Sequence, residues 1–68
     1  MIKDDQELEA TLDRIRHFQA QLKHLRRMET NATNYRLSAS GFISEIDRMQ
    51  LEVREYLSLL PSQVETGT

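Results

Sequence analysis

The sequence has no cysteine and no tryptophan, and only one proline and two glycines among its 68 residues. Without cysteine the chain forms neither disulfides nor thiolate zinc sites. Aromatic residues make up 6% and charged residues 29%, a balance that suits an exposed helical assembly better than an enzyme with a sealed pocket. No apolar run approaches the ~18 residues of a membrane-spanning helix, and the N-terminus lacks the apolar core of a signal peptide. We therefore expect a cytoplasmic protein with no membrane partner.

The short chain predicts a single domain, residues 1–68, near the size at which one core barely offsets the entropy cost of folding. Helix packing and oligomerisation are the remaining sources of stability. The net charge of −2 argues against general nucleic-acid binding. The charge is unevenly distributed: −3 over residues 1–12, +4 over residues 13–36 and −3 over residues 37–68.

The first segment, about residues 4–29, is predicted to be an amphipathic helix that no glycine or proline interrupts. Asp4 is placed as its N-cap, with Glu7 as the capping-box partner three residues later. The apolar residues recur every three or four positions: Leu8, Leu12, Ile15, Phe18, Leu22, Leu25 and Met28. This stripe is wider than a two-stranded coiled coil requires.

Residues 30–37, TNATNYRL, are predicted to connect two helices, because their Thr and Asn side chains compete for backbone hydrogen bonds. Asn31 or Asn34 is expected to adopt the left-handed conformation that closes a helix. The second helix is placed at about residues 39–60, with Ser38 as the N-cap and Pro61 as the stop signal. Ser40 is an alternative N-cap that shifts the start by two residues. A mobile tail is expected at residues 61–68.

Two such helices predict an all-α antiparallel hairpin. Each apolar stripe is wider than one partner helix covers, so the hairpin is expected to dimerise into a four-helix bundle. Fully burying one Leu, Ile or Phe is worth about 1.5–3 kcal/mol, which favours the pairing. The expected interface residues are Leu8, Leu12, Ile15, Phe18, Leu22, Leu25, Phe42, Ile43, Ile46, Met49, Val53, Tyr56, Leu57 and Leu60.

A basic cluster, Lys23, Arg26 and Arg27, offers a possible nucleic-acid contact, because clustered bases neutralise phosphates. A structural interpretation is stronger. Bases at the end of a helix and acids at its start complement the helix dipole. In a hairpin, the basic end is also expected to lie near Glu45 and Asp47 of the second helix and to help set the register.

No residue combination predicts catalysis, a cofactor or a metal site. His17 and His24 are separated by a helical rise of ~10.5 Å, too far to chelate one metal ion. Asp13 and His17 have a suitable spacing but supply only two ligands, so they are interpreted as a surface pair. We expect a protein that is not an enzyme.

The segments YRLSASGFISEIDRMQLEVREYL (Tyr35 to Leu57) and MIKDDQELEATLDRI (the first 15 residues) resemble a family of small bacterial two-helix proteins. Members are described as antitoxin-like components of toxin–antitoxin operons. They are similar to the helical segment that precedes the DNA-binding domain in Xre-type antitoxins of the host-inhibition-of-growth class. The resemblance implies a cytosolic protein that dimerises and binds a toxin. This chain departs from those regulators because it lacks their helix-turn-helix domain.

The sequence thus predicts a protein–protein interaction module that forms a homodimer, with a toxin or another helical protein as a further partner. Two alternatives stay open: a structural coiled-coil spacer, and a DNA-associated accessory protein that uses the basic end of the first helix.

Overall fold

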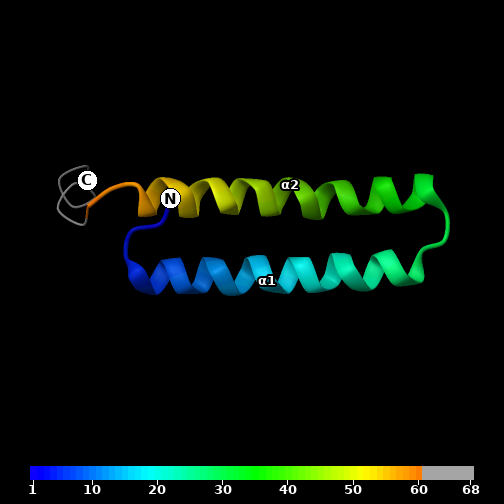
Figure 1. Ribbon diagram of the computed structural model, residues 1–68, viewed down its shortest axis with the longest axis horizontal. Helices are drawn as coiled ribbons and strands as arrows, with labels where there is room; N and C mark the ends of the chain where they lie inside the picture. The colour runs from blue at the N-terminus through cyan, green and yellow to red at the C-terminus, as the bar shows by residue number, and fades with distance from the viewer. Residues whose placement is uncertain (61–68) are drawn as a thin grey trace.

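The computed structural model describes residues 1–60, and in this range the chain folds into two antiparallel helices (Figure 1). Helix α1 spans Asp5–Met28 and helix α2 spans Ala32–Leu57. The prediction of an all-α hairpin is confirmed for this range. The tail predicted at residues 61–68 lies outside the described residues.

The start of α1 is fixed by the predicted N-cap. The Asp4 carboxylate accepts a hydrogen bond from the Glu7 backbone N–H at 2.8 Å. Glu7 reaches back in turn, and its Oε1 accepts from the Lys3 backbone N–H at 2.9 Å. The capping-box exchange is therefore present, although Glu7 binds the residue before the cap rather than the cap itself.

The connection is much shorter than the sequence predicted. It comprises residues 29–31, and α2 begins seven residues earlier than expected. Asn31, not Ser38, is the N-cap: its Oδ1 accepts from the Asn34 N–H at 3.0 Å, and its own N–H donates to Glu29 Oε1 at 3.0 Å. Asn31 is extended (φ −92°), and residues 1–60 contain no left-handed residue, so that expectation is wrong as well.

This error has a simple physical origin. Polar side chains that favour turns are equally favourable in the first turn of a helix, where backbone N–H groups lack partners. Thr33 and Asn34 occupy this first turn, and Ser38 lies inside the helix.

Helix α2 also ends three residues before the predicted end. Ser58 caps it, and the Leu59 N–H donates to the Tyr56 carbonyl in a tightened last turn at 3.3 Å. Because Leu60 precedes Pro61, and a residue before proline is disfavoured in the helical conformation, the helix ends early.

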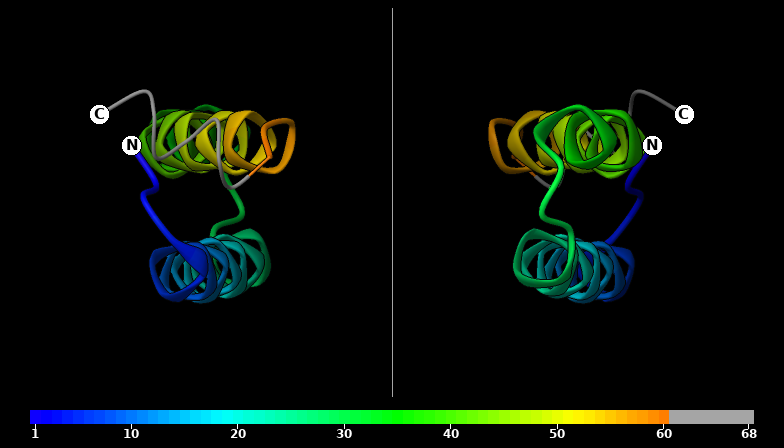
Figure 2. Two further views of the ribbon diagram at one scale, coloured as in Figure 1. Left: turned by 90° about the vertical axis from the view of Figure 1, so that its left-hand side faces the viewer. Right: turned by 90° about the vertical axis from the view of Figure 1, so that its right-hand side faces the viewer.

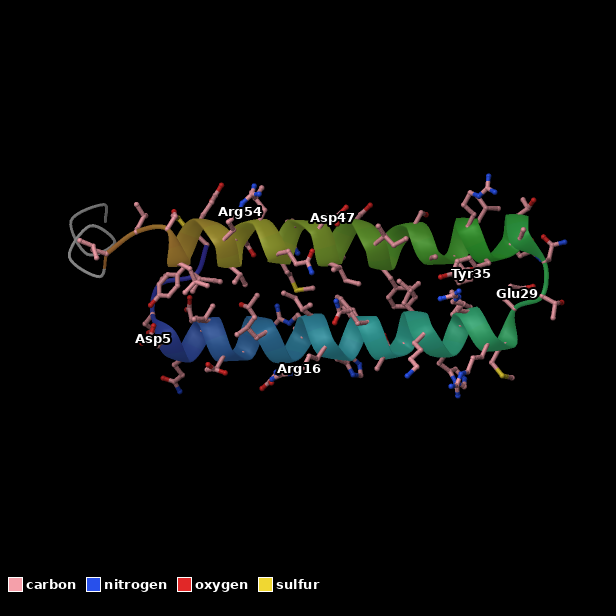
Figure 3. The ribbon with its side chains drawn as sticks, viewed as in Figure 1. Asp5, Arg16, Glu29, Tyr35, Asp47 and Arg54 are labelled. Carbon is pink, nitrogen blue, oxygen red and sulfur yellow. The ribbon has the colours of Figure 1, made fainter. Side chains whose placement is uncertain are left out.

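Seen end-on, the two helices form a single pair, one beside the other (Figure 2). The core is the row of side chains between them. Ile15, Ile46 and Met49 form its centre, and Met49 is only 2% exposed. The partly buried residues Phe18, Leu22 and Val53 pack against it. Towards the connection, the rings of Phe18 and Phe42 meet edge to face with centroids 5.9 Å apart. Figure 3 shows Tyr35 between the helices, whereas Asp47 and Arg54 lie on the outer side of α2.

Candidate interaction surface

The predicted interface residues fall into three groups within the hairpin. Four are buried: Leu8, Ile15, Ile46 and Met49. Seven are half-buried: Leu12, Phe18, Leu22, Leu25, Phe42, Val53 and Tyr56. Three are exposed: Ile43, Leu57 and Leu60. Most of the predicted stripe is therefore covered only in part by the other helix.

Two buried residues were not predicted. Ala39 is 1% exposed and lies seven residues before Ile46, so it continues the same helical row. The spacing contains that signal, but the predicted helix begins at about residue 39, so the predicted row starts only at Phe42. Ile2 is 4% exposed, and no periodicity identifies it because it precedes the helix.

The hairpin has two long faces, one on each side of the core row. One face, which we call the covered face, carries Glu7, Arg14, Gln21 and Met28 of α1 with Ser38, Glu45 and Glu52 of α2. Hollows on this side are lined by both helices: Glu7 and Arg14 meet Glu52 in one, and Phe18 meets Ser38 and Glu45 in another. The opposite flank, which we call the open face, carries Leu12, Gln19 and Arg26 of α1 with Ile43, Gln50 and Leu57 of α2.

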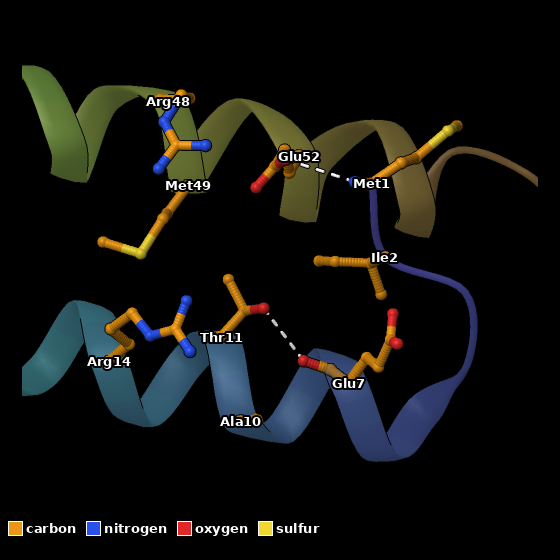
Figure 4. Close-up of a pocket in the computed structure, with 9 residues that line it drawn as sticks. All are labelled: Met1, Ile2, Glu7, Ala10, Thr11, Arg14, Arg48, Met49 and Glu52. Carbon is orange, nitrogen blue, oxygen red and sulfur yellow. Dashed lines mark hydrogen bonds and ion pairs between the residues drawn. The ribbon is translucent and has the colours of Figure 1, made fainter.

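Residues 1–3 cross one end of the covered face. The Met1 amino group lies 3.5 Å from the Glu52 carboxylate, and Ile2 lies between the helices (Figure 4). Met1 and Ile2 line the hollow of Glu7, Arg14 and Glu52, and Thr11 and Met49 border the same hollow. These three residues leave less of the covered face free for another protein.

The other end of the covered face is an apolar hollow near the connection. It is lined by His17, Ala20, Gln21, His24, Leu25, Met28 and Phe42. The Met28 side chain is largely exposed there. The Glu45–Arg48 ion pair lies between this hollow and residues 1–3. The hydrogen bond to Glu45 raises the pKa of Arg48.

Along α2, the open face is less polar than the covered face. Ile43 and Leu57 are 45% and 64% exposed, and Leu12 of α1 is half-buried on the same flank. Leu37 and Leu51 are also exposed, but they lie fourteen residues apart on the side of α2 that points away from α1. The open face is therefore the long surface where exposed apolar residues adjoin the core row.

The basic cluster Lys23, Arg26 and Arg27 is exposed and forms no ion pair within residues 1–60. The expected proximity to Glu45 and Asp47 is wrong. Phe18 packs against Phe42, so residues beyond Phe18 lie opposite the first turns of α2. Tyr35 borders Lys23 and Arg26 accordingly.

The surface pair expected between Asp13 and His17 is not formed, because Asp13 pairs with Arg16. His17 instead lies against the Phe18 ring, with centroids 6.2 Å apart. Within the described part of the chain, no group of three His, Asp or Glu side chains is placed to hold a metal ion. Neither of the two helices is long and apolar enough to cross a membrane.

Comparisons with protein-family profiles, with curated proteins and with solved structures found no match to this chain.

Proposed function

We propose that this chain is a non-enzymatic protein–protein interaction module that pairs with a second copy to form a four-helix bundle. The observation that carries the proposal is the incomplete burial of its apolar stripe. Seven of the fourteen predicted residues are half-buried and three are exposed. A second hairpin covers part of this stripe, and each fully buried large apolar side chain contributes about 1.5–3 kcal/mol.

The size of the hairpin supports the same conclusion. Its buried core comprises Ile2, Leu8, Ile15, Ala39, Ile46 and Met49, and one of these six is an alanine. Chains of this length without disulfides or metals commonly depend on oligomerisation for stability. In the proposed bundle the half-buried residues of two hairpins form one shared core.

The experiment is the solution mass, measured by light scattering over a range of concentrations. One chain has a mass of 8.0 kDa, and the wild-type protein is expected to have twice that mass. The variant Ile43→Asp with Leu57→Asp is expected to have the mass of one chain, because both side chains are exposed in the hairpin and charges there obstruct the second copy.

Leu37→Asp with Leu51→Asp is the matched control, since it introduces the same charges on the side of α2 that points away from α1. This control is expected to remain a dimer. A wild-type chain that stays a folded monomer at every concentration contradicts the proposal.

As a further part of the proposal, the dimer acts in the cytoplasm as the antitoxin-like component of a bacterial toxin–antitoxin operon. The support is the resemblance of residues 1–15 and 35–57 to small antitoxin-like proteins. Co-expression with the product of the adjacent reading frame tests it. Rescue of growth and a stable complex of the two purified proteins are expected, and the absence of both contradicts this part alone.

The alternative of a DNA-associated accessory protein relies on the exposed side chains of Lys23, Arg26 and Arg27. Phosphate contacts predict binding that weakens steeply with salt. A mobility-shift titration at low salt that shows no complex excludes it. A spacer, the other alternative, predicts a dimer that binds no second protein.

A further inference from the structure

Helix α1 is divided into an acidic half and a basic half. Residues 4–13 contain five acidic side chains and no basic one: Asp4, Asp5, Glu7, Glu9 and Asp13. Residues 14–28 contain five basic side chains and no acidic one: Arg14, Arg16, Lys23, Arg26 and Arg27. The division follows the direction of the helix dipole, but it extends far beyond the first and last turns, where that dipole acts.

Helix α2 does not neutralise this division within the hairpin. The first turns of α2, which lie opposite the basic half, carry Arg36 as their one charged residue before Glu45. Residues 14–44, the end with the connection, hold six basic residues and one acidic residue. The opposite end of the hairpin contains the start of α1 and the end of α2. It holds nine acidic and three basic residues within residues 1–13 and 45–60. The hairpin is thus positive at one end and negative at the other.

We propose that the partner on the open face is a second copy in antiparallel orientation, with its connection beside the acidic end of the first copy. This inference rests on the proposed function, because it specifies how the two hairpins pair. In this orientation α1 crosses α1 of the partner head to tail, so each acidic half faces a basic half. Two-fold symmetry makes the contact occur twice.

The parallel orientation places like charges together. The two connections then meet, each with an excess of five positive charges over residues 14–44, and the two acidic ends meet as well. Like charges brought together oppose association, and charge complementarity selects orientation even where it adds little affinity.

The choice of face follows from the position of residues 1–3. Ile2 is buried and Met1 is held near Glu52, so this segment occupies one end of the covered face. Within residues 1–60 no such segment lies on the open face, which presents Ile43 and Leu57. A contact along the full length of both helices therefore meets residues 1–3 on the covered face, and it does not meet them on the open face.

Spin labels test the orientation directly, and the absence of cysteine in the wild-type chain makes single-cysteine variants simple to label. Thr30→Cys places a label at the connection, and Gln6→Cys places one at the other end of α1; both positions are exposed. In the antiparallel dimer the two Thr30 labels are expected about 36 Å apart, the length of 24 residues at 1.5 Å each. In a mixture of the two variants, the label at position 30 of one chain and the label at position 6 of its partner are expected to lie a short distance apart.

A short distance between two Thr30 labels overturns the antiparallel arrangement but leaves the dimer, and so the proposed function, intact. A monomeric mass overturns both. The two failures are therefore distinguishable in the same samples.

Charge reversal provides a second test. Lys23→Glu with Arg26→Glu, or Glu9→Lys with Asp13→Lys, is expected to weaken dimerisation by about tenfold, because symmetry doubles each lost pair. All four changes in one chain restore the affinity. The control Arg14→Glu with Arg48→Glu makes the same change in net charge as Lys23→Glu with Arg26→Glu, but on the covered face, and leaves the dimer intact. If the fourfold variant stays as weak as the double variants, the antiparallel contact is wrong.

Discussion

Tyr56 and Asp5 are 51 residues apart in the sequence, and the Tyr56 hydroxyl donates a hydrogen bond of 2.7 Å to Asp5 Oδ1. This bond joins the last turn of α2 to the first turn of α1. It raises the pKa of Tyr56 to about 12, chiefly through the hydrogen bond itself, with burial and the charges of Asp5 and Asp4 adding to it. The end of the hairpin opposite the connection is thus fastened by a polar contact.

The shift in the pKa of Tyr56 predicts a pH dependence of stability. The folded pKa lies above the ordinary value of 10, so the neutral hydroxyl stabilises the hairpin at pH values below about 10. That contribution is lost as the pH rises through about 12. Thermal unfolding of wild type and Tyr56→Phe is expected to differ at neutral pH and to converge at high pH. Tyr35→Phe, at the other end of the hairpin, is the control; equal pH profiles of wild type and Tyr56→Phe contradict the prediction.

Met49 is the most deeply buried large side chain of the core row. Met49→Ala leaves a cavity between the helices and is expected to lower the free energy of unfolding by about 2–5 kcal/mol. Urea denaturation followed by circular dichroism measures the change. Leu51→Ala, two residues away on the exposed side of α2, is expected to change stability by less than about 0.5 kcal/mol. Equal effects of the two variants are incompatible with the core described above.

Asn31 caps α2 through its side-chain oxygen. Asn31→Ala removes the partner of the Asn34 N–H and is expected to cost about 0.5–2 kcal/mol. Ser38→Ala is the matched comparison, because the sequence pattern predicts the cap at Ser38. Ser38 lies inside the helix, so alanine is expected to be neutral or to add a few tenths of a kcal/mol. A larger loss for Ser38→Ala than for Asn31→Ala moves the start of the helix back to residue 39.

Gly41 lies within α2, and its backbone angles are ordinary for a helix. A Cβ added there meets no other atom within 4 Å. Because glycine inside a helix is less favourable than alanine by roughly 0.5–1 kcal/mol, Gly41→Ala is expected to raise the unfolding midpoint. A lower midpoint indicates that this position is packed against another chain.

The sequence predicts the helical character of both segments, because an apolar residue every three or four positions is a strong signal over 20 residues or more. It also predicts the cap at Asp4, where the acidic partner Glu7 is specific. It fails at Asn31, because Thr and Asn favour turns and first helical turns alike, and only the backbone geometry distinguishes the two. Ile2 is missed since its burial depends on tertiary contacts with α2 and on no local pattern.

The interaction surface is less predictable than the fold. Periodicity identifies a wide stripe, but it does not separate Met49, which the hairpin itself buries, from Ile43, which it leaves exposed. That distinction requires the relative rotation of the two helices. The charge division of α1 is visible in the sequence, whereas its lack of a partner in α2 follows from the packing of Phe18 against Phe42.

The three-residue connection also determines the order in which this molecule can fold. Contacts beside the connection join residues close in sequence, so closing them costs little chain entropy, whereas Asp5 and Tyr56 must close a loop of 51 residues. The helices are expected to zip from the connection outwards, at the high speed of chains rich in local contacts. The segment around Ile2 then docks last, once the final turns of α2 exist, and it is the first to detach when the hairpin opens.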